Sequence, residues 1–267
     1  MKKRILLLCA LLVSVITLSG AANVITFTTA KAVGKTVKLT MTYKGNKPKL
    51  TGMTGTPVSG EEVTYTLTSQ TVTITGDVTY FDCYCNQLTA LDLTHNNALT
   101  MLVCSVNQLT ALDLSHNTAL TELYCSNNQL TALDLSHNTA LKTLDCPNNQ
   151  LTVLDLSHNT ALTECSCSEN QLTVLDVSKN TALTELFCYG NQLTALDLSK
   201  NTALTWLRCY GNQIKGEEIT RLVKSLPDRT DKEAGEFIVV QEPAPEGNRC
   251  LKTDVAIAKG KNWIVKV

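Results

Sequence analysis

The sequence predicts a β-rich solenoid, in which the chain winds into stacked turns between a different kind of segment at each end. A 21-residue pattern repeats without a gap from Val78 to about Gln213. Apolar residues alternate with variable ones inside each copy, which is typical of short strands with one buried face. The pattern fails before and after this region, where a solenoid must cover its exposed ends. The seven copies begin at Val78, Leu99, Leu120, Leu141, Leu162, Leu183 and Leu204.

Each copy has the form L-x-x-L-x-C-x-x-N-Q-L-T-a-L-D-L-S-x-N-t-a. The fourth and sixth positions should point inward from a short strand, while their neighbours point outward. The second half repeats the same spacing, since Leu130, Leu133 and Leu135 are arranged like Leu120, Leu123 and Cys125. We therefore expect a strand, and hence a sheet, on both sides of the coil.

Asparagine ends each half of the pattern, from Asn86 to Asn212 on one side and from Asn96 to Asn201 on the other. A buried amide can pair with backbone groups that a sharp corner leaves without partners. We interpret both asparagine columns as structural.

Seven cysteines occupy the sixth position: Cys83, Cys104, Cys125, Cys146, Cys167, Cys188 and Cys209. Side chains on successive turns project side by side, which does not suit the geometry of a disulfide, and a linear column does not converge on a tetrahedral metal. The column predicts a ladder of buried thiols. Cys165 should join this core, whereas Cys85 and Cys250 are assigned no partner.

The pattern resembles the 21-residue cysteine-ladder class of bacterial leucine-rich repeats, of the internalin J type. The resemblance covers about half of the chain directly. It implies a right-handed coil with parallel strands, and a function in extracellular recognition or adhesion without a chemical reaction. No cofactor is implied, and the ligand is not specified, because the variable positions differ between family members.

Residues 1–22 are interpreted as a signal peptide, since Lys2, Lys3 and Arg4 precede an apolar run that ends in small residues. A retained membrane anchor is the alternative. We expect an exported protein that is secreted or associated with the cell surface or outer membrane. Removal of this segment takes away three positive charges and changes the formal net charge from -1 to -4. The mature chain has no basic run and no second apolar stretch of membrane-spanning length, so neither nucleic acid nor a membrane span is expected.

The two ends differ from the repeats. Residues 23–77 alternate as strands do around Val37–Tyr43, Val63–Leu67 and Val72–Ile74, and predict a β-rich N-terminal cap, with an independent small domain as the alternative. Residues 214–267 predict an α/β C-terminal cap with helices over 214–226 and 253–259 and strands over 237–240 and 263–267. The repeats themselves span 78–213.

Asp, Ser and His occur together in the second half of three copies, as at Asp113, Ser115 and His116, and lysine replaces His in the last two such halves, at Lys179 and Lys200. A hydrolytic triad needs one pre-organised nucleophile, base and oxyanion site, whereas an exposed array of copies has no pocket. We therefore predict no catalytic residues and no enzyme. The aspartate and histidine columns leave divalent-metal binding as an alternative, although repetition explains them equally well.

The outward positions of the first strand vary between turns, and there a partner can be specified. Seven of the thirteen aromatic residues occupy these positions, and those of the last two turns should form one patch with Arg208. An alternative is that the C-terminal cap covers these rings. The predicted partner-binding residues are Tyr80, Tyr84, Tyr124, Glu185, Phe187, Tyr189, Trp206, Arg208 and Tyr210.

These features favour a recognition or adhesion module that binds a protein, such as a host protein or another bacterial surface protein, through the variable face. Glycan binding through the exposed aromatic rings is the alternative, and a purely structural spacer is a third interpretation.

Overall fold

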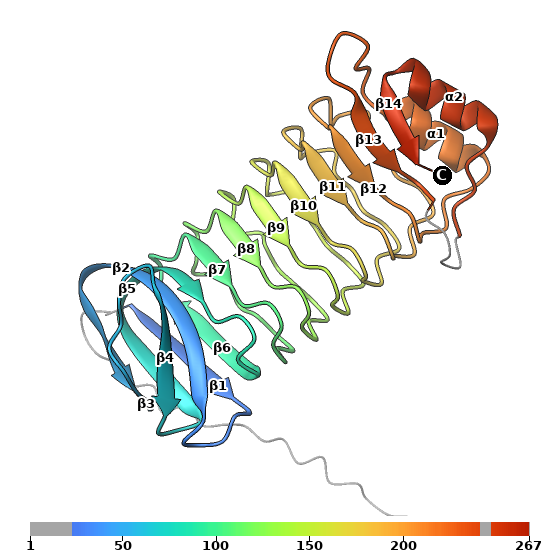
Figure 1. The fold of residues 1–267 in the computed structure, drawn as a ribbon. Coiled ribbons are helices and arrows are strands. Elements are labelled where there is room, and N and C mark those ends of the chain that lie inside the picture. The colour runs from blue at the N-terminus through green and yellow to red at the C-terminus, as the bar shows by residue number, and fades with distance from the viewer. Residues whose placement is uncertain (1–22, 241–246, 267) are drawn as a thin grey trace, which may run out of the picture.

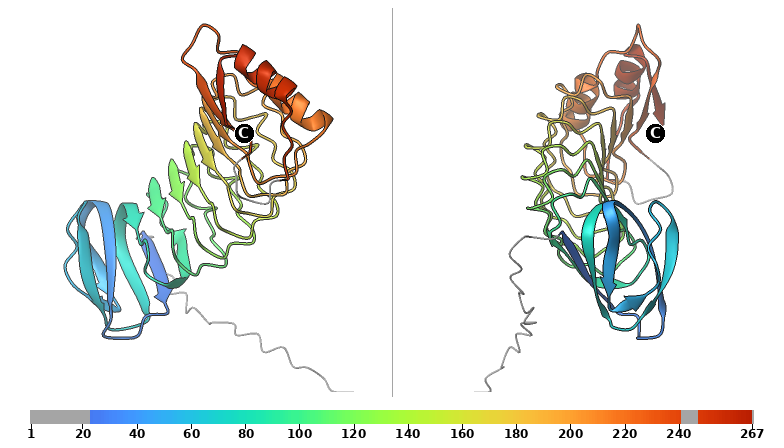
Figure 2. Two further views of the ribbon diagram at one scale, coloured as in Figure 1. Left: turned by 45° about the vertical axis from the view of Figure 1, so that its right-hand side comes forward. Right: turned by 90° about the vertical axis from the view of Figure 1, so that its left-hand side faces the viewer.

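The computed structural model describes residues 23–240 and 247–266, so the predicted signal peptide lies outside the described residues. Figures 1 and 2 show an elongated molecule in which a group of strands at the N-terminal end leads into a row of stacked turns. A small α/β segment follows at the other end. No helix in the described ranges is long and apolar enough to cross a membrane.

The N-terminal end is built from strands β1 (Val24–Thr29), β2 (Thr36–Thr51), β3 (Met53–Thr54), β4 (Glu62–Leu67) and β5 (Thr71–Asp82). The predicted alternating segments lie in β2, β4 and β5, where Val37, Leu39 and Tyr65 are buried. β5 continues directly into the first repeat turn, and β1 pairs antiparallel with both β5 and β6 (Leu88–His95). The N-terminal strands therefore share a sheet and a core with the repeats.

The first half of each turn forms one rung of a parallel sheet. The end of β5 pairs with β7, and each later rung pairs with its equivalent 21 residues further on, as in Leu123 with Leu144. The rungs are β7 (Met101–Val103), β8 (Glu122–Tyr124), β9 (Thr143–Asp145), β10 (Glu164–Ser166), β11 (Glu185–Phe187) and β12 (Trp206–Arg208). The solenoid with parallel strands expected from the sequence is confirmed.

The expectation of a sheet on both sides of the coil is wrong. After β6, the described second half-turns contain no regular strand. Neighbouring turns are linked there by isolated backbone bonds, such as Gln129 N–H to Leu109 O at 2.8 Å. Other polar groups are satisfied inside the turn, as in the bond from Asn138 N–H to Leu135 O at 3.0 Å. The equal spacing of leucines fixes which side chains are buried, but these local bonds replace a strand ladder.

At the C-terminal end, helix α1 (Glu217–Ser225) replaces a second half-turn and buries Ile219, Leu222 and Val223 in the solenoid core. Strands β13 (Gly235–Ile238) and β14 (Trp263–Lys266) extend the sheet in parallel beyond β12, and helix α2 (Lys252–Gly260) lies between them in sequence. Figure 1 shows both helices packed beside these two strands. All four predicted elements are present, with bounds shifted by a few residues.

The ladder cysteines are all buried, and Cys165 lies in the same core. The six from Cys83 to Cys188 are free thiols, as are Cys85, Cys165 and Cys250. Two of the thiols donate to the carbonyl of the next turn, Cys83 Sγ to Val103 O and Cys146 Sγ to Ser166 O, both at 3.4 Å. Burial raises the pKa of Cys104, Cys125, Cys146 and Cys188 well above 9.0, and neighbouring ladder thiols add to the rise.

The asparagine columns join consecutive turns. Asn149 Nδ2 donates to Cys125 O at 3.1 Å and to Cys146 O at 3.2 Å, while its Oδ1 accepts from Leu130 N–H at 3.0 Å. Asn159 of the second column likewise donates to Leu135 O and Asn138 O. Amides such as Asn149 therefore pair with backbone groups of their own turn and the one before, and amides such as Asn159 with those of the turn before, as expected for a structural role.

Candidate functional site

The outward side of the rungs is called the strand face here; it is formed by the third and fifth positions of each turn, and by the seventh where its side chain is exposed, as at Tyr189 and Tyr210. On its last two turns, Phe187 and Trp206 meet edge to face, with ring centroids 5.1 Å apart and an interplanar angle of 84°. The Arg208 guanidinium lies 4.6 Å from the Trp206 centroid and 5.1 Å from that of Phe187. Contacts of this geometry are favourable cation–π interactions and hold the guanidinium against both rings.

Tyr189 and Tyr210 form a second aromatic pair beside the first. Their rings stack with centroids 4.6 Å apart and planes inclined by 9°. Tyr189 and Tyr210 occupy equal positions of neighbouring turns. Phe187 is paired with Arg208 in the parallel sheet, so it meets Trp206, two residues before Arg208, diagonally. We call Phe187, Tyr189, Trp206, Arg208 and Tyr210 the aromatic patch.

The C-terminal segment also contributes to this patch. Trp206 Nε1 donates to Glu236 Oε1 at 3.0 Å, and Glu236 forms ion pairs with Arg208 at 3.9 Å and with Lys266 at 3.2 Å. These contacts follow from the alignment of Trp206 with Glu236 in the extended sheet. The sequence analysis missed Glu236 and Lys266, because the pairing of β12 with β13 lies outside the repeat pattern. The five patch side chains are partly exposed.

The predicted partner-binding residues do not all meet. Glu185 lies beside Trp206 in the sheet and so borders the aromatic patch. Tyr124 lies on β8, where its hydroxyl donates to Glu122 Oε2 at 3.1 Å. Tyr80 is on the first rung, where its hydroxyl donates to Asp82 Oδ2 at 3.3 Å, and Tyr84 follows that rung with 53% exposure. The nine residues thus form one group of six and three outliers.

The seventh position is less uniformly outward than the sequence suggests. Ser105 and Ser168 are buried there, at 6% and 0% exposure. The Ser105 hydroxyl accepts a hydrogen bond from Ser126 N–H at 3.1 Å, so this small side chain packs against the next turn. Larger residues, such as Tyr189 and Tyr210, cannot be enclosed in this way and stay partly exposed.

Carboxylates dominate the remaining strand face. Burial raises the pKa of Asp145, opposed by hydrogen bonds from Ser126 and Ser166. Burial and then the neighbouring Glu164 carboxylate raise the pKa of Glu185, with Arg208 opposing the shift. The pKa of Tyr124 is raised to about 12, first by burial and then by the bond to Glu122 and the charges of Glu122, Glu164 and Asp145. The face therefore carries a concentrated negative charge.

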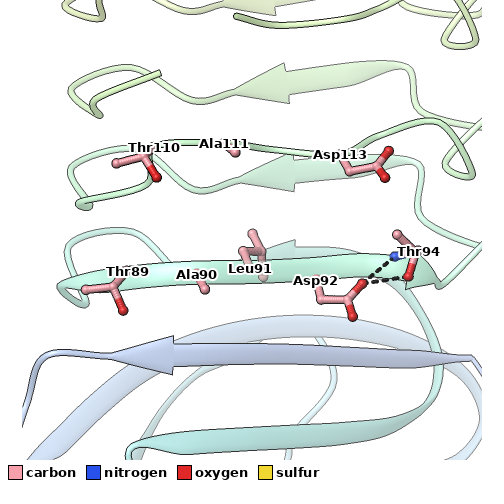
Figure 3. Close-up of a pocket in the computed structure, with 8 residues that line it drawn as sticks. All are labelled: Thr89, Ala90, Leu91, Asp92, Thr94, Thr110, Ala111 and Asp113. Atoms are coloured by element: carbon pink, nitrogen blue, oxygen red, sulfur yellow. Dashed lines mark hydrogen bonds between the residues drawn. The ribbon is translucent and has the colours of Figure 1, made fainter. Parts of the chain in front are cut away.

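The opposite outward side, formed by the second half-turns, is called the turn face. It has a shallow depression of about 380 Å³. Figure 3 shows the residues that line it, with Thr89, Ala90 and Asp92 beside Thr110, Ala111 and Asp113 of the next turn. Asp92 Oδ1 accepts bonds from both Thr94 N–H at 3.0 Å and Thr94 Oγ1 at 2.7 Å. The depression results from small side chains in two columns and repeats at Ala111 and Ala132.

The Asp, Ser and His residues of the turn face have structural roles. Asp113 Oδ1 accepts from Ser115 N–H at 2.9 Å and from Ser115 Oγ at 2.7 Å, and these bonds lower the pKa of Asp113. Ser115 Oγ is also 3.0 Å from His116 Nδ1. Since the serine proton is donated to Asp113, the imidazole must donate to the hydroxyl and cannot activate it. Among the described residues, no group of three or more His, Cys, Asp or Glu side chains is arranged to hold a metal ion.

Comparison with known proteins gives matches in structure only. No family model matches the chain. No curated protein matches it. The functional domain of InlJ from Listeria monocytogenes, described as including a cysteine ladder, is similar at 29% identity and a TM-score of 0.49 over 73% of this chain and 50% of that one. This chain thus spans half the length of the InlJ chain that it matches.

Two further bacterial structures are similar. Internalin C2 of Listeria monocytogenes matches with 23% identity and a TM-score of 0.57, covering 71% of this chain and 81% of that one. A leucine-rich-repeat protein of Leptospira interrogans matches with 19% identity and a TM-score of 0.43, covering 67% and 60%. The internalin C2 match and the stacked 21-residue turns together establish that this chain has the leucine-rich-repeat fold, with a ladder of buried cysteines.

Proposed function

We propose that this chain is an exported recognition or adhesion module that binds a protein partner through the strand face, with the aromatic patch as the main contact. The observation that carries the proposal is the contrast between the two outward sides. The turn face repeats the same contact from serine N–H to aspartate, as at Asp113 and Asp134. The strand face instead gathers the Phe187–Trp206 pair, which contacts Arg208, and the Tyr189–Tyr210 pair. Tyrosine, tryptophan and arginine dominate the binding energy of many protein interfaces.

The leucine-rich-repeat fold supports a binding role, since such solenoids present long surfaces assembled from equivalent positions. Export is proposed from the charged and apolar N-terminal residues, which are outside the described ranges. A catalytic role is not proposed. In the group of Asp113, Ser115 and His116, the serine hydroxyl donates to the aspartate, whereas in a triad it donates to the histidine.

The test is a double substitution, Trp206→Ala with Tyr210→Ala, screened against immobilised extracellular proteins and against a glycan array. We expect loss of protein capture by at least about tenfold, because each aromatic pair loses one ring. The melting temperature should change by only a few degrees, since both side chains are partly exposed.

A matched control is Val153→Ala with Val174→Ala, which removes two exposed apolar side chains from the turn face, at 71% and 72% exposure. Its capture of partners should equal that of the wild type. Unchanged capture by the aromatic variant would reject the site, and glycan binding without protein capture would reject the protein partner in favour of the glycan alternative.

A further inference from the structure

The strand face carries carboxylates without ion-pair partners among the described residues, and Arg208 offsets the charge of Glu185 only in part. Its outward strand positions hold five acidic residues before the aromatic patch: Asp82, Glu122, Asp145, Glu164 and Glu185. In the described ranges, no ion pair joins a lysine or arginine to any of them. Arg208 and Lys266, the basic residues at the C-terminal end of this face, both pair with Glu236 instead.

The carboxylates are held by neutral groups or lie next to one another. Tyrosine hydroxyls donate to Asp82 and Glu122, and serine hydroxyls bond to Asp145. Glu164 and Glu185 are direct neighbours on β10 and β11, so two negative side chains are side by side at the spacing of adjacent strands, about 4.8 Å. Like charges in this arrangement repel each other, and a cation from outside would relieve the repulsion.

The acidic residues adjoin the aromatic patch directly. Glu185 is paired with Trp206 in the sheet, and Phe187 follows Glu185 by two positions on the same outward side. Carboxylates next to aromatic faces bind lysine and arginine side chains both by charge and by cation–π contact. Arg208 already demonstrates the second mode within this chain, since its guanidinium rests against Trp206 and Phe187.

We propose that the strand face binds a lysine- and arginine-rich surface of a protein partner, with Glu164 and Glu185 as the acidic anchor beside the aromatic patch. This inference rests on the proposed function and adds the chemistry of the partner to it. Charge complementarity would raise the association rate and exclude acidic partners. It also predicts that binding weakens with salt, because these carboxylates remain accessible to water.

The test measures fluorescence anisotropy of labelled peptides of about ten residues, namely deca-arginine, decalysine and decaglutamate, at about 50 and 300 mM salt. The variant Glu164→Gln with Glu185→Gln keeps side-chain shape and removes two charges. We expect it to bind both cationic peptides at least about fivefold more weakly than wild type, with weaker binding at the higher salt concentration. The control, Glu61→Gln with Glu233→Gln, removes the same charge from exposed positions outside the rungs and should change affinity less than about twofold.

Equal weakening in both double variants, or equal binding of decaglutamate, would overturn the proposal. A second copy of this chain is the rival occupant, because the N-terminal strands and loops carry Lys31, Lys35, Lys38, Lys44, Lys47 and Lys49. Light scattering that showed a dimer lost on Glu164→Gln with Glu185→Gln would assign the face to self-association and reject an external partner. If protein capture is lost in the variant Trp206→Ala with Tyr210→Ala but kept in the variant Glu164→Gln with Glu185→Gln, the proposed function stands and the cationic partner is rejected.

Discussion

A single position of the repeat sets the backbone at each corner. The eighth residue of every turn has a positive φ, between 51° and 64°, and is Cys85, Val106, Asn127, Asn148, Glu169, Gly190 or Gly211. Glycine and asparagine tolerate this left-handed conformation, whereas a β-branched residue is strained in it. Val106, with φ of 57°, is therefore the residue that fits its corner worst. The repeat pattern has a variable residue, x, at this position, so it did not indicate that φ must be positive there.

Replacing Val106 by Asn should stabilise the protein by about 1 kcal/mol, because asparagine relieves the strain of the left-handed backbone. The free energy of unfolding in urea measures the effect. Asn127→Val is the matched reverse change, made at the equivalent corner one turn later with φ of 54°. It should destabilise by a similar amount, and effects of equal sign in the two variants would contradict the explanation.

At the level of an element, the cysteine column is a chemical unit as well as a packing unit. Each thiol is buried against the thiols of adjacent turns, so ionising one of them would place a charge in the core without a partner. The asparagine columns satisfy backbone groups, whereas the cysteine column supplies small apolar side chains that fit between leucines. A dependence of stability on pH follows.

Stability should fall as pH rises above about 9. The unfolded chain loses its thiol protons near the ordinary pKa of 9.0, while burial raises the pKa of the folded thiols well above that value. The unfolded state then binds fewer protons, so unfolding is favoured by about 1.4 kcal/mol per pH unit and per thiol. Urea unfolding from pH 7 to 10, with reductant present, measures this slope. The variant Cys125→Ala with Cys146→Ala should be less stable than the wild type at pH 7, but its free energy of unfolding should fall less steeply with pH above pH 9. An unchanged slope would show that the cysteine ladder does not cause the pH dependence.

For the whole molecule, the repeat determined most of what the sequence could predict. Leucine, cysteine and asparagine recur at fixed intervals, so the order of rungs, the buried ladder and the outward positions of Phe187 and Trp206 followed from counting. The missing second sheet did not follow, since the same leucine spacing fits a strand or a run of turns, and bonds such as Asn138 N–H to Leu135 O decide between them. Glu236 was also missed, because nothing in the repeat indicates which later strand extends the sheet.

Because the contacts that join turns reach only neighbouring turns, a complete turn should be removable. The asparagine side-chain bonds of Asn149 and Asn170 that cross between turns span 19 or 24 residues, which links each turn to the one before it. Deletion of Leu141–Ala161 joins Ala140 to Leu162 and restores the pattern, with Asn170 in place of Asn149 as the acceptor for Leu130 N–H. We expect a folded chain with cooperative unfolding, a lower melting temperature because one interface is lost, and an intact aromatic patch. Circular dichroism and the fluorescence of partly exposed Trp206 measure these properties.

Deletion of residues 149–158 removes only half a turn and would place the next rung on the wrong side of the coil, so it should prevent folding. Equal damage from both deletions would show that stability depends on contacts beyond adjacent turns.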